Sequence, residues 1–267
     1  MSVHNSPLGQ EAGYPQTYAP EALYPIARID ARNDAGIGYS LPFDGVDIWN
    51  AWELSWLNDN GVPQAATLEL RVPADSPNLV ESKSLKLYLG SFAMSTFADR
   101  ADVQEAIETD LSAAAGAPVV VTFDCDAAIA ELPGSCIDSI ATQCDAYHVN
   151  PDLLDANPED VVKECLHTHL LRSLCPVTGQ PDLGSLQVCY SGPRIDPAAL
   201  LRYVVSFREH NDFHEACVER IFVDILERCC PQELTVAARY QRRGGIDINP
   251  FRTNAGNKPE NRRLWRQ

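Results

Sequence analysis

The sequence has 267 residues, with 21 Lys and Arg against 37 Asp and Glu, which gives a formal net charge of −16. This acidic balance argues against a nucleic-acid-binding protein, because neutralising phosphates requires a basic surface. Hydrophobic residues make up 45% of the chain, enough for one large domain or two modest ones. No apolar run approaches membrane-spanning length, so no membrane partner is expected.

The expected compartment follows from the N-terminus and the cysteines. Residues 1–6 show no basic region followed by an apolar stretch, so no signal peptide is expected. The nine cysteines are odd in number and have no regular spacing. These features predict a cytoplasmic protein whose thiols stay free.

The first half of the chain shows strand and helix patterns after an unpatterned start. Residues 1–33, rich in Pro, Gly, Tyr and Ala, are expected to form an irregular arm. Hydrophobic alternation predicts strands over 48–56 and 65–72. Apolar residues at helical spacing predict one helix that begins near Ser82 and a second over 99–115. Two further strands are expected, over 118–123 and 141–148.

The second half repeats this order of elements. Strands are expected over 161–171 and 184–190, followed by a helix that opens at Asp196-Pro197, with Asp as the N-cap. A second helix is expected over 212–230, and two more strands over 234–240 and 246–249. Each half therefore has the order strand, strand, helix, helix, strand, strand. This repeat suggests a tandem duplication, seen in the order of the elements and not in sequence identity.

The stretch 174–182 combines a cysteine, turn-forming Pro, Gly and Pro residues, and an acid. Turn chemistry of this kind folds the chain back, so Asp182 is expected to return close to Cys175. A sulfur nucleophile beside a proton donor suits addition to a polar multiple bond. The alternative is that Cys175 is a small core residue and Asp182 a turn cap, because free cysteine is usually buried.

Two acidic motifs lie where helices are expected to begin. Asp212, with Glu215 three residues later, matches a capping box, and Glu81 suits a charged, solvated helix start. The alternative for Glu215 is that its carboxylate, which offers only acceptors, binds a ligand.

The segment from Cys175 to Asp182, CPVTGQPD, together with ESKSLKLY from Glu81 to Tyr88, closely resembles the QueF family. These are the NADPH-dependent 7-cyano-7-deazaguanine reductases of queuosine biosynthesis. The resemblance covers nearly the whole chain and suits the long, two-module form. It implies an α+β fold of tandem tunnelling-fold (T-fold) modules, whose antiparallel sheets assemble into a barrel. The N-terminal arm would comprise residues 1–33, the first module 34–155 and the second module 156–267. The resemblance also implies that two chains form a homodimer.

The resemblance also implies the chemistry and the residues that perform it. Reduction of a nitrile to an amine takes four electrons, and a thiolate that adds to the nitrile forms a thioimide that accepts hydride. Cys175 would be the nucleophile and Asp182 the general acid. The residues implied to bind the substrate are Glu81, Ser82, Lys83, His214 and Glu215.

The cofactor implied by the resemblance is NADPH, held by Lys83, Ser84, Arg243 and Gly244. No Gly-x-Gly-x-x-Gly follows a strand, so a Rossmann site is not supported. The stretch 239–245 is basic in an otherwise acidic chain. Because guanidinium groups bind phosphates in a bidentate manner, such a stretch suits a phosphorylated cofactor.

A metal site is a weaker interpretation of the segment around His167. Alternation on a strand would place Cys165, His167 and His169 on one face, and such a set could bind zinc. No fourth ligand stands out in the sequence, so no metal is expected.

The sequence is also compatible with two other functions. Cys, Glu and Lys are the catalytic residue types of nitrilases, so Cys175, Glu81 and Lys83 could serve a thiol hydrolase that releases ammonia and does not use NADPH. The protein could also be a non-catalytic barrel that binds a purine or pterin and catalyses no reaction.

Overall fold

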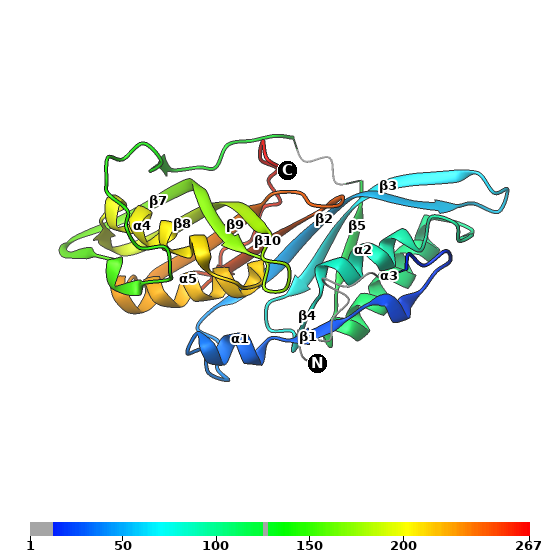
Figure 1. Cartoon of the computed structure of the whole chain (residues 1–267), viewed down its shortest axis with the longest axis horizontal. Coiled ribbons are helices and arrows are strands. Elements are labelled where there is room, and N and C mark those ends of the chain that lie inside the picture. The colour runs from blue at the N-terminus through cyan, green and yellow to red at the C-terminus, as the bar shows by residue number, and fades with distance from the viewer. Residues whose placement is uncertain (1–12, 125–127) are drawn as a thin grey trace. The chain divides into compact units, whose positions relative to one another are not determined.

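The computed structural model describes residues 13–124 and 128–267, which form two compact units built from separate parts of the chain (Figure 1). The described residues of the first unit are 13–30, 47–124 and 242–248, and those of the second are 31–46, 128–241 and 249–267. Within these residues, every helix is too short or too polar to span a lipid bilayer.

The N-terminal segment is more regular than expected. Residues 1–12 of the predicted arm lie outside the described residues. The remainder contains a 3-10 helix, η2 (Pro20–Ala22), the strand β1 (Pro25–Ala27) and the helix α1 (Ile29–Asp34). β1 pairs antiparallel with β4 (Asn78–Val80). The prediction of an irregular arm is therefore wrong for this part, because backbone pairing with β4 orders a segment that has no hydrophobic period of its own.

The strands of the first unit confirm three of the sequence predictions. β2 (Asp44–Leu57), β3 (Pro63–Pro73) and β5 (Val120–Phe123) follow one another in the order β5-β3-β2. β3 and β5 are antiparallel, with Leu68 opposite Phe123. The Trp52 backbone N–H donates to the carbonyl of Gly245 at 2.9 Å, which brings the turn before β10 beside β2.

Two helices pack on this sheet, as predicted. They are α2 (Ser82–Gly90) and α3 (Arg100–Ala115). The Asp99 carboxylate caps α3 by accepting from two backbone N–H groups, and Gly116 ends it in the left-handed conformation, with φ of 72°. The apolar residues of α3 that recur four apart are fully buried in the core of this unit, namely Val103, Ile107 and Leu111.

The last strand expected in the first half is absent: residues 141–148 have no regular secondary structure. The segment has few large apolar side chains, and most of its residues are exposed or only half-buried, so it offers no apolar face to a sheet. A two-residue strand, β6 (Ser135–Cys136), occurs upstream instead and pairs in parallel with β7 in the second unit.

The second unit follows the predicted order of elements. β7 (Ala156–Leu174) and β8 (Pro181–Ile195) are followed by α4 (Pro197–Val205) and α5 (His214–Cys229), then β9 (Glu233–Tyr240) and β10 (Ile246–Thr253), of which residues 249–253 belong to this unit. The 3-10 helices η3 (Pro151–Leu153) and η4 (Ser206–Glu209) flank these elements. Asp196 caps α4 as predicted, by accepting from the Ala198 N–H at 2.8 Å. The strand order is β10-β9-β8-β7-β6, and α5 packs on β9.

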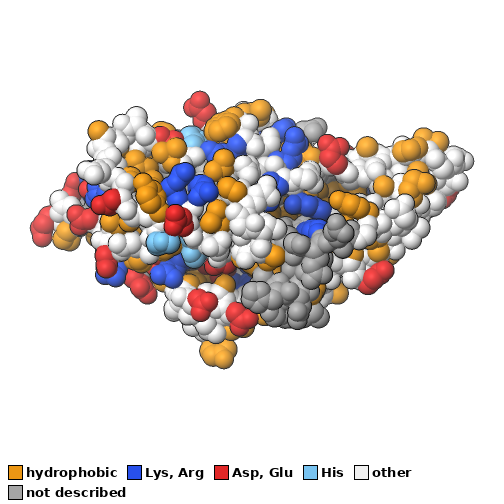
Figure 2. Space-filling model, viewed as in Figure 1, with side chains coloured by type: hydrophobic (Ala, Val, Ile, Leu, Met, Phe, Trp, Pro, Cys, Tyr) orange, Lys and Arg blue, Asp and Glu red, His pale blue; other side chains and the backbone are white. Residues whose placement is uncertain are grey.

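The protein is thus a mixed α+β structure whose strands are mainly antiparallel, and the described strands of neither unit close into a barrel. Figure 2 shows acidic side chains at the left end of the view, where the second unit lies. At the start of β7, Asp155 and Glu159 are exposed. This acidic surface lies at the opposite end of β7 from Cys175.

The expectation that the thiols stay free is wrong for one pair. Cys165 on β7 and Cys189 on β8 form a disulfide. The antiparallel register places these two residues directly opposite each other, so their sulfur atoms can reach one another. Neither the spacing nor the odd number of cysteines indicates this pairing, which depends on the register of two long strands.

A buried ionic triad anchors α5. The Glu219 carboxylate accepts two hydrogen bonds from Arg32, each of 2.8 Å, and further bonds of 2.8 and 3.1 Å from Arg252. All three side chains are nearly inaccessible to solvent. One carboxylate is therefore shared by two guanidinium groups, and its loss would leave both of them buried without this partner.

We expect Glu219→Gln to lower the free energy of unfolding by about 3–5 kcal/mol, because it leaves two buried guanidinium groups without their carboxylate. Urea unfolding followed by circular dichroism measures this change. Glu227→Gln, an exposed position of the same helix, is the matched control and should change stability by less than about 0.5 kcal/mol. Equal effects of the two substitutions would contradict the role of the triad.

Candidate active site

Cys175 lies directly after β7, at the start of the turn that leads to β8. The backbone N–H of Cys175 donates to the carbonyl of Gln180 at 2.9 Å, and that of Gly179 donates to the carbonyl of Cys175 at 3.0 Å. Gly179 has φ of 66°, a conformation that favours glycine. The side chain of Cys175 is 7% exposed. The predicted reversal of the chain is confirmed, since Ser173 pairs with Asp182 across the two strands.

The start of α5 is held beside this turn by main-chain bonds. Leu174 donates to the carbonyl of His210 at 2.8 Å and accepts from the N–H of Asp212 at 3.1 Å. The predicted capping box is therefore wrong: the helix begins two residues later, at His214, and the Asp212 N–H donates to Leu174 instead of closing the box. Glu215 falls in the first turn and is 1% exposed.

His214 links the general acid expected from the sequence to the strand β9. Its Nε2 lies 3.4 Å from Oδ2 of the buried carboxylate of Asp182. Its ring stacks on that of Tyr240, with a centroid separation of 3.7 Å and an angle of 4°. The other ring nitrogen, Nδ1, is buried and has no hydrogen-bond partner within the described part of the chain. The imidazole is thus fixed in orientation and can exchange a proton with Asp182.

Three residues beneath this site were not identified from the sequence: Ser173, Cys217 and Tyr240. Cys217 is fully buried, and burial raises the pKa of its thiol well above the usual value, with the hydroxyls of Ser173 and Tyr240 acting in the opposite direction. Burial also raises the pKa of Tyr240. Cys217 is therefore a neutral thiol that packs the site, while Cys175 occupies the turn. The alternation in the strand 234–240 does not indicate which of its residues meets His214.

In the first unit, Glu81 caps α2. Its carboxylate accepts from the backbone N–H of Lys83 at 2.6 Å and of Ser84 at 2.8 Å. The Ser84 hydroxyl donates to the Glu81 carbonyl and accepts from the N–H of Tyr24 at 3.0 Å. Glu81 is completely buried, so the interpretation of a solvated helix start is wrong, whereas Ser82 and Lys83 are half-buried. Burial raises the pKa of Glu81, and the two backbone N–H groups oppose that shift.

The other predicted residues of the first unit lie in the turn 242–245. The Arg243 N–H donates to the carbonyl of Ile246 at 2.8 Å, and Gly244 has φ of 60°. A Cβ atom at Gly244 would lie 3.2 Å from Cδ of Lys86, so this turn runs alongside α2. The Arg242 guanidinium lies 6.0 Å from the centroid of the Trp52 ring. The first unit therefore brings basic residues of α2 together with those of this turn.

The predicted site residues thus fall into two groups. Cys175, Asp182, His214 and Glu215 belong to the second unit. The start of α2 and the turn with Arg243 and Gly244 belong to the first. Each group combines the chemistry expected of it: a thiol with a His–Asp pair in one, and a helix N-terminus with basic side chains in the other.

Comparison with known proteins identifies the class to which this arrangement belongs. Residues 14–123 match the family described as "Nitrile reductase, 7-cyano-7-deazaguanine-reductase N-term", and residues 181–259 match the family described as "QueF-like protein". Both the N-terminal and the C-terminal parts of the chain therefore match families of the QueF type.

Similarity to individual proteins extends over nearly the full length. A protein of Azoarcus sp. (strain BH72) is 57% identical, with 93% of this chain and 90% of the relative covered. A protein of Bordetella pertussis is 53% identical over 97% of each, and one of Paraburkholderia phytofirmans is 51% identical over the whole of both. All three are named NADPH-dependent 7-cyano-7-deazaguanine reductase. The chain belongs to the QueF family, which confirms the resemblance inferred from its motifs.

The raised pKa of Glu81 predicts a pH-dependent contribution to stability. Because the pKa is higher in the folded protein than the value of about 4.3 in an unfolded chain, this group favours folding below about pH 4.3 and loses that contribution as the pH rises through its raised pKa. We expect Glu81→Gln to gain stability relative to the unsubstituted protein as the pH rises from about 4.3 towards neutrality.

Urea unfolding at a series of pH values tests this expectation. Met94→Ala, an exposed position in the same unit with no titrating group, is the control for handling and buffer effects. If the stability of Glu81→Gln relative to the unsubstituted protein stays constant or falls as the pH rises, the folded state does not disfavour the Glu81 carboxylate.

Proposed function

We propose that this protein reduces the nitrile of 7-cyano-7-deazaguanine to the primary amine of 7-aminomethyl-7-deazaguanine, using NADPH. The observation that carries this proposal is the 51–57% identity, over nearly the full chain, to proteins named for this reductase. The reaction takes four electrons, and NADPH supplies them as two hydrides when bound. The remaining steps are acid–base and nucleophilic chemistry, for which this chain offers its own side chains.

Cys175 is the nucleophile in this proposal. Its sulfur adds to the nitrile carbon, the nitrile nitrogen takes up a proton, and a covalent thioimide results. Its position in a tight turn with low exposure supports this role, because the thiol is held in place and shielded from bulk water. The carbon–sulfur bond breaks after the first reduction, and Cys175 is regenerated.

Asp182 is the general acid, and His214 orients it. The carboxyl group of Asp182 is within reach of the Cys175 turn through the pairing of β7 and β8. His214 lies 3.4 Å from it and is itself held against Tyr240, so a proton can pass between the two residues without rearrangement of the backbone. Tyr240 is a positioning residue here, since it acts through His214.

In this proposal, two carboxylates and the residues next to them in the chain bind the substrate. Glu215 is buried at the start of α5, next to His214, where its carboxylate suits the N–H and amino edge of a deazaguanine. Glu81, Ser82 and Lys83 form the second set of substrate contacts in this proposal. The backbone bonds that Glu81 accepts also define the start of α2, so this residue has a structural role besides recognition.

The phosphates of NADPH would be held by the first unit, at Lys83, Ser84, Arg243 and Gly244. The basic side chains of α2 and of the turn 242–245 suit an anionic group, because Lys and Arg donate charge-assisted hydrogen bonds to phosphate oxygens. The Ser84 hydroxyl is engaged by Glu81 and Tyr24, so its part is to support the start of the helix that carries Lys83.

The architecture proposed with this function is a pair of T-fold modules, over 34–155 and 156–267, in a cytoplasmic homodimer. The order strand, strand, helix, helix, strand, which occurs in both halves, supports it, as does the mainly antiparallel pairing of the strands. Assembly of two chains would supply the further strands that a barrel needs.

The proposed reaction predicts the consumption of two NADPH for each amine formed when 7-cyano-7-deazaguanine is added. Loss of NADPH absorbance together with quantification of the amine by mass spectrometry gives this ratio. Cys175→Ala should abolish turnover, whereas Cys230→Ser, an exposed cysteine outside the site, should leave it unchanged. Release of ammonia without NADPH consumption would indicate a thiol hydrolase, and binding without either would indicate a non-catalytic barrel.

The role of Asp182 gives a separate prediction. Asp182→Asn preserves the size of the side chain and removes the acid, so we expect kcat to fall by about 10²–10⁴-fold. Because the thiol is untouched, a covalent adduct of the nitrile on Cys175 should still be detectable by intact-protein mass spectrometry. A kcat within a few-fold of the unsubstituted value would assign the proton to another donor.

A further inference from the structure

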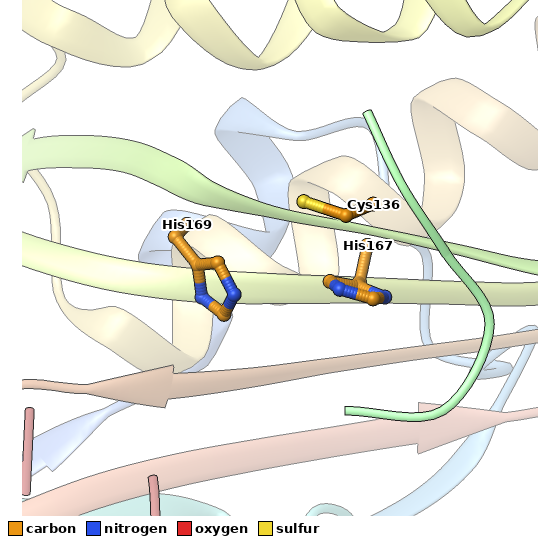
Figure 3. Close-up of side chains that lie close together, drawn as sticks. All are labelled: Cys136, His167 and His169. Atoms are coloured by element: carbon orange, nitrogen blue, oxygen red, sulfur yellow. The ribbon is translucent and has the colours of Figure 1, made fainter. Parts of the chain in front are cut away.

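A cluster of one cysteine and two histidines lies on β6 and β7, apart from the proposed catalytic residues. Alternation along β7 places His167 and His169 on one face, and the parallel pairing of β6 with β7 sets Cys136 directly opposite His167. One potential ligand atom from each of the three residues lies within 4.8 Å of the others (Figure 3). Cys165, which the sequence places on the same face, is engaged in the disulfide with Cys189.

The two imidazoles are prepared for a ligand in different ways. His167 is 8% exposed, and its Nδ1 is buried without a hydrogen-bond partner in the part of the chain that the structure describes. Nδ1 of His169 lies 2.8 Å from the Ser185 hydroxyl, which orients the ring and leaves Nε2 for another partner. Metal-binding histidines are commonly held in this way through the nitrogen that does not bind the ion.

The charges around the cluster are balanced. The Asp138 carboxylate accepts from the Thr168 hydroxyl and from the backbone N–H of His169, so its negative charge lies beside the histidines. Arg266 donates to the backbone carbonyl of His169 at 2.8 Å and brings a positive charge to the same place. A deprotonated Cys136 would supply the further negative charge that a divalent cation requires.

We propose that Cys136, His167 and His169 form a binding site for Zn²⁺, with a fourth position open to water. One thiolate and two imidazoles match the preference of this ion for sulfur and nitrogen ligands in tetrahedral geometry. Ligand atoms around tetrahedral zinc are about 3.3–3.6 Å apart, so the cluster closes by roughly 1 Å on binding. Cys136 is exposed and lies on a two-residue strand, so it can make this movement.

The ion would join β6 to the long strand β7. β6 is held to β7 by a parallel pairing of only two residue pairs, Ser135 with Leu166 and Cys136 with His167. Coordination of the ion by Cys136 and the two histidines would add a strong link between these two strands. The site does not depend on the proposed reaction, because none of its three ligands takes part in it.

Titration of the tag-free protein with Zn²⁺, without thiol reductants, tests the proposal. We expect binding of one Zn²⁺ per chain by isothermal titration calorimetry, and a thermal midpoint that rises with zinc concentration. Co²⁺ in place of Zn²⁺ should give the intense visible bands of a tetrahedral ion and a thiolate-to-metal charge-transfer band in the near ultraviolet. Cys136→Ser should lose the charge-transfer band and lower the affinity for Zn²⁺ by at least tenfold.

Control variants separate this site from the other thiols. Cys230→Ser removes another exposed cysteine, and Cys175→Ala removes the proposed nucleophile; both should keep the cobalt spectrum unchanged. His167→Gln tests the buried ligand, with circular dichroism to verify that it folds. The proposal is overturned if the unsubstituted protein binds no Zn²⁺, or if Cys136→Ser binds it as tightly and with the same cobalt spectrum.

Discussion

The antiparallel pairing of β7 with β8 is the constraint on which the second unit depends. Its register places Ser173 opposite Asp182 and, beyond a register shift between Thr168 and Leu171, Cys165 opposite Cys189. A shift of one residue at the Asp182 end would turn the side chain of Asp182 to the other face and separate it from His214. The main-chain pairing at this end of β7 and β8 therefore determines where Asp182 lies.

The N-termini of α2 and α5 are used in different ways. At α2, the buried Glu81 carboxylate accepts two backbone N–H groups, which offset part of the cost of burying its charge. At α5, the residue before the helix provides no side-chain cap, and main-chain bonds between Leu174 and the segment 210–212 hold the start instead. The first turn of α5 then carries His214 and Glu215, two of the residues proposed to bind the substrate.

The cysteines illustrate how environment decides the role of one residue type. Cys175 lies in the tight turn between β7 and β8, Cys217 is a fully buried thiol with a raised pKa, and Cys165 is bonded to Cys189. Cys136 is exposed opposite two histidines. Composition and spacing do not distinguish these four kinds of cysteine, because the differences among them arise from strand pairing, burial and neighbouring charges.

Local patterns in the sequence predict the elements with strong periodicity, the order of strands and helices in the second half, and the family, because motifs such as Cys175–Asp182 and Glu81–Tyr88 are local. The start of α5 at His214, the stacking of His214 on Tyr240 and the lack of a strand over 141–148 are evident only in the folded protein. The same is true of the proximity of Cys136, rather than Cys165, to the histidines. These features depend on contacts between residues far apart in the chain, which hydrophobic period and capping preference do not encode.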